Sequence, residues 1–283
     1  MPRGVGLNWL YDEARLQGRL WTPNTLGSQT VMSILPSNPE TVLLDDSKRA
    51  FAVHDLSLIQ ANFTQTNASF RPSYANFGLF SGIENTAFNW MIRDVGVSVP
   101  LPEMTLWMAV MWTGNSSQIY PAFITAASQS TSNDFSTGFS LDRGFSNATN
   151  PIPTLAVASP KDISNTNLLS QTIPYNSPTI ICARVRDLDG FQRLSVNGRQ
   201  QGLSKSATDG TIDTRIIRLF ARYYNVELQA CERGIIGGAF IAQGAVGNAI
   251  VQAGEGYLAW ACKIQDKLEA SHPFRNRPPL IGD

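Results

Sequence analysis

Paired carboxylates are the first candidates for chemistry in this sequence, because two carboxyl groups at a suitable separation can catalyse glycoside hydrolysis. Retaining glycosidases hold two carboxyl groups about 5 Å apart, and two strand residues share a face when they are two positions apart. Asp187 and Asp189 have this spacing, in the segment Arg-Asp-Leu-Asp-Gly-Phe. Gly190 follows immediately, as is typical of a polar turn between strands. The pattern favours a solvated turn over a catalytic pair.

Nucleophilic and metal chemistry find little support. The two histidines are His54, beside Asp55, and His272, and no Gly-x-Ser-x-Gly segment supplies a serine nucleophile. Three widely spaced cysteines without a Cys-x-x-Cys pair do not form a zinc site, and we expect free thiols at Cys182, Cys231 and Cys262. Asp45-Asp46 is too small a cluster to indicate calcium. We therefore expect no enzymatic activity, no cofactor and no metal.

Sugar binding is the remaining ligand chemistry. Lectin sites stack a sugar on an exposed aromatic ring and hydrogen-bond its hydroxyl groups with amides or charged side chains. The candidates that the sequence places in or near loops are Tyr120, Tyr175, Tyr223, Tyr224 and Asn225, with Phe145, Asn115, Asn147 and Asn150 as further possibilities. Trp107 and Trp112 lie within an apolar run and are predicted to be core residues.

Short strands must position these side chains. Apolar or alternating runs bounded by Gly, Pro, Asn or Asp occupy 103–114, 121–128, 137–143, 153–160, 178–187, 191–204, 217–224 and 234–243. Asn197-Gly198 within 191–204 is a strong signal of a two-residue hairpin turn. Regular strands without intervening helices predict an all-β, jelly-roll-like sandwich of two antiparallel sheets.

A helix is predicted at each end of the strand-rich region. Residues 7–20 have an apolar stripe and a terminating Gly18, and this segment either packs on the sandwich or anchors the chain to a neighbouring protein through Leu7, Trp9, Leu10 and Tyr11. Residues 248–268 place their apolar side chains on one face, namely Ile250, Tyr257, Trp260, Ala261, Ile264 and Leu268. We assign 1–20 as an N-terminal extension and 21–283 as one sandwich domain.

The segment from Glu255-Gly-Tyr-Leu-Ala-Trp260 through Leu268 to His272-Pro273-Phe274 and Pro278 resembles the closing helix and tail of concanavalin A-like (laminin-G-like) sandwich domains, common in bacteriophage virion proteins. Trp21-Thr-Pro, Asp55, Ser57 and Arg71-Pro-x-Tyr74 resemble the opening of the same family. Cys262 and Lys263 depart from its usual Trp-Gly, and 81–85 lacks most of the acids of its Phe-Asp-Gly-x-Asp-Asp turn. The Glu-x-Asp-x-x-Glu motif of its carbohydrate-active members is missing.

The resemblance implies a non-enzymatic virion structural protein, either a tail-fibre or adhesin-type component or a head decoration. Its partners would be other virion proteins and a host surface glycan. The alternatives are a carbohydrate-binding receptor-recognition lectin and, third, a glycosidase.

Composition fits the virion assignment. The chain has 283 residues with 22 basic and 22 acidic side chains, which argues against a nucleic-acid binder. No signal-peptide pattern and no run of 18 apolar residues occur. We therefore expect a virion protein made in the host cytoplasm, without membrane insertion. A homo-oligomer is compatible with this assignment, although no heptad repeat supports it.

Overall fold

The chain folds into two stacked antiparallel sheets, and the computed structural model describes residues 8–116, 120–142, 156–158, 173–185, 191–205, 210–224, 227–229, 232–244 and 246–283. Sheet I has the order β15 (Arg199–Lys205), β14 (Phe191–Val196), β13 (Thr179–Val185), β9 (Met104–Trp112), β20 (Gly234–Gln243), β6 (Phe80–Asn85) and β5 (Ser73–Phe77), and β1 (Thr30–Ile34) also pairs with β20. The predicted all-β sandwich is confirmed.

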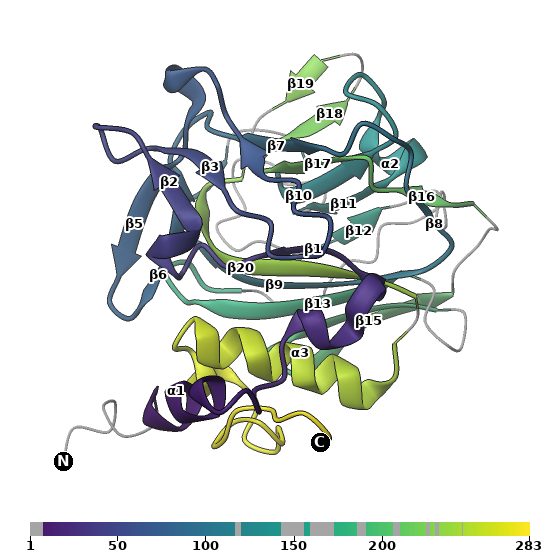
Figure 1. Ribbon diagram of the computed structural model, residues 1–283. Helices are drawn as coiled ribbons and strands as arrows, with labels where there is room; N and C mark the ends of the chain where they lie inside the picture. The colour runs from purple at the N-terminus through teal and green to yellow at the C-terminus, as the bar shows by residue number, and fades with distance from the viewer. Residues whose placement is uncertain are drawn as a thin grey trace.

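Sheet II faces sheet I across the main core (Figure 1). Its order is β12 (Ala156–Ala158), β11 (Phe139–Asp142), β10 (Ala122–Ala127), β17 (Ile216–Leu219), β7 (Met91–Asp94), β4 (Phe63–Thr64), β3 (Ala50–Val53) and β2 (Val42–Leu44). Two smaller pairs join β8 (Pro100–Leu101) to β16 (Ile212–Asp213) and β18 (Arg222–Tyr224) to β19 (Glu227–Gln229).

In the described ranges, three α-helices accompany the strands: α1 (Asn8–Leu16), α2 (Asp134–Thr137) and α3 (Asn248–Ala261). Short 3-10 helices are η1 (Pro23–Gln29), η2 (Pro39–Thr41), η3 (Ala68–Phe70) and η4 (Gln265–Lys267). Figure 1 shows α3 and α1 beneath sheet I, whereas α2 and the β18–β19 hairpin lie on the opposite side, beyond sheet II. Within the described part of the chain, no helix is long and apolar enough to cross a membrane.

Strand β9 is buried along its whole length because both of its faces are covered. Met108, Val110 and Trp112 point into the core between the sheets, while Trp107 and Met111 point toward α3. A strand covered on two faces has no polar alternation, which explains the continuous apolar run of the sequence. The prediction that Trp107 and Trp112 are core residues is confirmed.

The Asn197-Gly198 hairpin joins β14 to β15 as predicted. Both residues have positive φ, 54° and 85°, which is the backbone of a type I′ turn. The turn also docks on the C-terminal tail, because a Cβ atom on Gly198 would lie 2.5 Å from the His272 ring. Glycine is required here for both its φ and its size.

The closing helix is shorter than the predicted 248–268 and ends at Ala261. Lys263 has φ 59°, and the amides of Lys263 and Ile264 donate to the carbonyls of Trp260 and Ala259. This is a Schellman ending with lysine in the left-handed position that glycine usually takes. Leu268 is buried against the same cluster as the helix, which is why its apolar character extended the periodicity past the helix end.

The prediction of a single strand at 217–224 is wrong, because this segment is divided into two strands, β17 and β18. Phe220 has φ 64°, and its amide donates to the Phe123 carbonyl at 2.8 Å. The break turns Arg222 to Tyr224 out of sheet II and into the β18–β19 hairpin. A long-range backbone bond, rather than the local apolar pattern, sets this boundary.

Candidate functional site

The outer face of sheet I is closed by apolar packing. Trp107 stacks on Phe240 with ring centroids 4.4 Å apart, and Trp21 and Tyr257 pack edge-on or tilted around them. The Trp107 indole donates to the Val251 carbonyl of α3 at 3.1 Å. A Cβ atom on Gly254 would lie 2.6 Å from that indole nitrogen, so the close approach of helix and sheet depends on this glycine.

A buried polar clamp fixes the tail to this face. Glu255, 1% exposed, accepts a 2.6 Å hydrogen bond from the Ser195 hydroxyl, and its other oxygen lies 3.3 Å from His272 Nε2. The Phe274 amide donates to His272 Nδ1, which leaves Nε2 as the nitrogen that donates to Glu255. Residues of the motif that resembles concanavalin A-like domains therefore join helix, sheet and tail.

The outer face of sheet II carries charge instead. Ser140, Thr125, Arg218 and Ile92 are paired across β11, β10, β17 and β7 and form a row that points away from sheet I. Arg218 and Thr125 are buried, because α2 and the β18–β19 hairpin lie over this region (Figure 1). A polar row buried on the outside of a sandwich must find its partners there.

Arg222, from β18, is the most strongly held member of this region. Its Nη2 and Nε donate to the two carboxylate oxygens of Asp134 at 2.7 and 3.2 Å, and its Nη1 lies 3.4 Å from Asp142 Oδ2. Asp142 in turn accepts a 2.6 Å hydrogen bond from Ser140. All three charged side chains are buried. The bidentate ion pair joins α2 to β18, and the single contact with Asp142 adds β11.

Two predicted sugar-binding tyrosines belong to this cluster. The Tyr120 ring lies 5.7 Å from the Arg222 guanidinium carbon, and the Tyr223 ring lies 5.8 Å from that of Arg218. Tyr120 also offers its carbonyl to Arg222 Nη1 at 3.2 Å, from a backbone with φ 53°. Both rings are half-buried. We define the sheet II cluster as Tyr120, Asp134, Asp142, Arg218, Arg222 and Tyr223.

The other predicted sugar-binding residues lie elsewhere or outside the described residues. Tyr175 is half-buried against the core between the sheets, next to Asn176, whose amide donates to the carbonyl of Trp112. Tyr224 lies in β18, but its side chain is outside the described part, as are Asn225, Phe145, Asn147 and Asn150. The structure therefore brings Tyr120 and Tyr223 to one cluster.

The residues weighed for catalysis are held in structural roles or are not described. Asp55 pairs with Arg93 at 3.2 Å and accepts from the Ser33 and Ser57 amides, so it does not orient its neighbour His54. Asp187 and Asp189 fall outside the described residues. Among the residues that are described, no three His, Cys, Asp or Glu side chains gather as a metal site.

The predicted anchor helix lies against the sandwich with part of its surface free. Tyr11 packs on the apolar cluster beneath sheet I, and Leu10 is half-buried. Leu7 and the side chain of Trp9 are outside the described residues. Leu16, at the end of α1, is 81% exposed. Tyr11 therefore belongs to the face of α1 that packs on the sandwich, while Leu16 stays free for contact.

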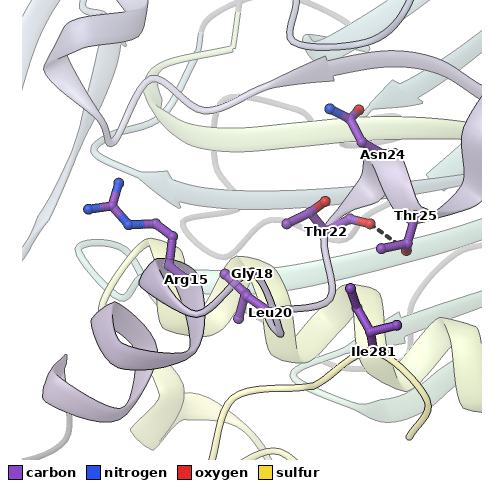
Figure 2. A pocket seen from close by; sticks show the side chains of 7 residues that line it. All are labelled: Arg15, Gly18, Leu20, Thr22, Asn24, Thr25 and Ile281. Carbon is purple, nitrogen blue, oxygen red and sulfur yellow. Dashed lines mark hydrogen bonds between the residues drawn. The ribbon is translucent and has the colours of Figure 1, made fainter.

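An open hollow of about 360 Å³ lies beside this helix (Figure 2). Arg15 borders it on the α1 side, Thr22 and Asn24 come from the segment at η1, and Ile281 comes from the C-terminal tail. The segment that follows α1 and the C-terminal tail meet here, since the Trp21 amide donates to the Pro279 carbonyl and the Ile281 amide donates to the Arg19 carbonyl. Ile281 is 59% exposed.

The sequence patterns did not identify Arg218, Arg222, Asp134 or Asp142. Arg218, Arg222 and Asp142 share one signal, a charged residue inside an apolar run: the arginines of Ile-Arg-Leu-Phe-Ala-Arg-Tyr-Tyr and the aspartate of Phe-Ser-Leu-Asp. Asp134 lies at the start of α2, outside such a run. Buried strands rarely carry a charge without a partner. A charged residue inside an apolar run therefore indicates a partner of opposite charge elsewhere in the fold.

No protein-family model and no curated protein sequence matches the chain. Solved structures do resemble it. Domain 4 of AbnA, a GH43 extracellular arabinanase from Geobacillus stearothermophilus in complex with arabinotriose, matches with a TM-score of 0.50 and 12% identity over 79% of this chain and 96% of that one.

Botulinum neurotoxin type C, whose cell entry depends on interaction with two ganglioside molecules, matches with a TM-score of 0.51 and 11% identity, over 84% of this chain and 53% of the toxin chain. The binding domain of botulinum neurotoxin DC in complex with SialylT matches with a TM-score of 0.51 and 11% identity, over 82% and 51%. This chain thus spans about half the length of the toxin chains. At such identities the likeness establishes the β-sandwich fold alone.

Proposed function

We propose that this chain is a non-enzymatic, carbohydrate-binding β-sandwich module that binds sugar at the sheet II cluster. The observation that carries the proposal is the pairing of Tyr120 with Arg222 and of Tyr223 with Arg218. A guanidinium against each ring and the Asp134 ion pair fix the rings in place, which lowers the entropy lost on binding. The half-buried rings then offer apolar edges and faces on which a sugar can stack.

The structural neighbours support this chemistry without assigning it. One was solved with arabinotriose, and another belongs to a toxin that depends on gangliosides. The same sandwich can therefore present sugar-binding groups in other proteins. Because fold does not determine function, the proposal depends on the tyrosine–arginine pairs of this chain rather than on the neighbours.

A glycan array tests the proposal. The wild-type protein is expected to bind a subset of glycans, and Tyr120→Ala and Tyr223→Ala should each weaken that binding about tenfold, as expected for losing about 1.4 kcal/mol of stacking. Tyr11→Ala removes a half-buried tyrosine beneath the other sheet and should leave binding unchanged. An array without hits, or equal binding by all variants, would refute glycan binding at this cluster.

A second proposal concerns where the module works. We propose that it is displayed on a bacteriophage particle, as a tail-fibre, adhesin-type or head-decoration component. The family resemblance of the tail motif supports this placement. Two exposed apolar residues also suit contact with another virion protein, namely Leu16 at the end of α1 and Ile281 in the lining of the hollow.

Point substitutions test the attachment. Leu16→Glu and Ile281→Glu should reduce co-sedimentation of the protein with particles at least tenfold, because each places a charge in an apolar contact. Val97→Glu changes an equally exposed apolar residue in another loop and serves as the control. Undiminished incorporation of the first two variants would remove this surface as the attachment site.

A further inference from the structure

Among the described residues, three buried arginines belong to or pack against sheet II, and their partners differ. Arg93 is paired with Asp55, and Arg222 is held by Asp134 and Asp142. Arg218, which is 1% exposed, has no carboxylate within ion-pair distance in the described part of the chain. The two carboxylates whose charge acts on it are already paired, Asp134 with Arg222 and Asp94 with Arg215.

The guanidinium of Arg218 is also incompletely hydrogen-bonded. Its Nη2 donates to the Ser130 carbonyl at 2.6 Å, while its Nη1, although buried, has no hydrogen-bond partner among the described residues. Burial lowers the pKa of Arg218 from its ordinary value, and the negative charge of Asp134 only partly opposes this. A buried cation held by one carbonyl is unfavourable for folding, so stability does not explain its presence.

An exposed turn covers part of Arg218, beside α2 and the β18–β19 hairpin. Gln129, Ser130 and Thr131 are exposed, and the turn is closed by a 3.2 Å bond from the Ser132 amide to the Gln129 carbonyl. Its contact with Arg218 is the backbone carbonyl of Ser130, which a stronger acceptor can replace. Tyr223 borders the same guanidinium, so a ligand on that ring would reach Arg218.

We propose that Arg218 receives a carboxylate of the ligand, so that the glycans bound at the sheet II cluster are acidic, carrying a uronic or sialic acid. This inference rests on the proposed sugar-binding function and names its ligand class. A carboxylate matches the two terminal nitrogens of a guanidinium and forms two charge-assisted hydrogen bonds. It would replace the Ser130 carbonyl at Nη2 and supply the partner that Nη1 lacks.

Matched glycans separate this inference from the proposed function. Uronic-acid and sialylated oligosaccharides are compared with the same oligosaccharides after reduction of the carboxylate to a hydroxymethyl group. The acidic forms should bind at least tenfold more tightly, with an affinity that falls as salt is raised. Equal binding of both forms would overturn the acidic specificity and leave sugar binding intact. Binding of neither form would overturn both.

Variants at Arg218 test whether this side chain causes the preference for acidic glycans. Arg218→Met should lose at least tenfold in affinity for acidic glycans while its thermal midpoint stays at or above that of the wild type, because an uncompensated buried charge is removed. Arg215→Met changes a half-buried arginine that is paired with Asp94; it is the matched control and should bind normally. Arg218→Lys keeps the charge without the planar fork and should bind weakly. Wild-type affinity in Arg218→Met would overturn the assignment.

Discussion

The two outer faces of the sandwich are stabilised in different ways. Beneath sheet I, rings and aliphatic side chains from β9, β20, α3 and the tail form a continuous apolar cluster, and Glu255 provides the buried carboxylate that joins Ser195 to His272. Beyond sheet II, Arg222 is anchored by carboxylates, while Arg218 is buried with an incomplete set of hydrogen bonds.

This difference separates stability from function. Apolar burial is non-directional and stabilises whatever it covers, so the sheet I face suits a permanent docking of helix on sheet. Buried charge requires exact partners and contributes little net stability even when paired. Arg222 has carboxylate partners and a role in the fold, whereas the buried Arg218 lacks such partners, which points to a ligand at Arg218 on sheet II.

The largest expected loss of stability is on the outer face of sheet I, where α3 packs. Trp107→Ala removes a fully buried ring that stacks on Phe240 and bonds to α3, and should lower the free energy of unfolding by about 3–5 kcal/mol. Urea denaturation followed by circular dichroism measures it. Leu43→Ala, on the exposed edge strand β2, is the control and should change stability by less than about 0.5 kcal/mol. Equal effects would mean that α3 is not docked through this stack.

Substitution of Arg222, on the outer face of sheet II, should lower the free energy of unfolding nearly as much. Arg222→Met leaves the buried carboxylates of Asp134 and Asp142 without their cation and should destabilise by roughly 3 kcal/mol. Comparison with Arg218→Met in the same denaturation series sharpens the contrast, since that variant is expected to be at least as stable as the wild type. Comparable destabilisation by both substitutions would show that Arg218 stabilises the fold as Arg222 does.

A smaller loss is expected at the polar clamp. Glu255→Gln removes the charge facing His272 and leaves one buried amide group imperfectly paired, which costs about 1–3 kcal/mol. Glu269→Gln, an exposed partner of Arg199 on the same tail, should have an effect close to zero. If the two variants unfold at the same denaturant concentration, the clamp does not hold the tail.

The reactivity of the two buried thiols reports whether water reaches the apolar cluster beneath sheet I, and its measurement does not require a destabilising substitution. Burial raises the pKa of Cys262 to about 12, and burial followed by the nearby Glu255 charge raises that of Cys182. Both thiols are therefore protonated at pH 8 and inert while the fold is intact. In a Cys231→Ser background, a disulfide reagent should modify them only at the rate of unfolding. Fast modification of native protein would show that water reaches the sheet I cluster.

Most of the fold could be predicted from local patterns. The Asn197-Gly198 turn, the apolar runs and the amphipathic helix each carry their own signal, and the resemblance of the tail motif marks residues that dock helix on sheet. The helix end at Ala261 depends on a lysine in the left-handed position that glycine usually takes, and the boundary at Phe220 depends on a long-range hydrogen bond to Phe123, so neither is marked by a familiar sequence signal. The sheet II cluster was half predicted: Tyr120 and Tyr223 follow from residue type, but their arginines come together only when α2 and β18 fold over the sheet.

Nuclear magnetic resonance mapping with the tightest glycan from the array tests sugar binding at sheet II most directly. Backbone amides and arginine Nε–Hε groups are followed as the glycan is added. We predict saturable shifts centred on residues 120–127 and 216–224, including the side chains of Arg218 and Arg222, with α3 unchanged. Shifts centred on α3 or on the hollow beside Arg15 would contradict sugar binding at the sheet II cluster.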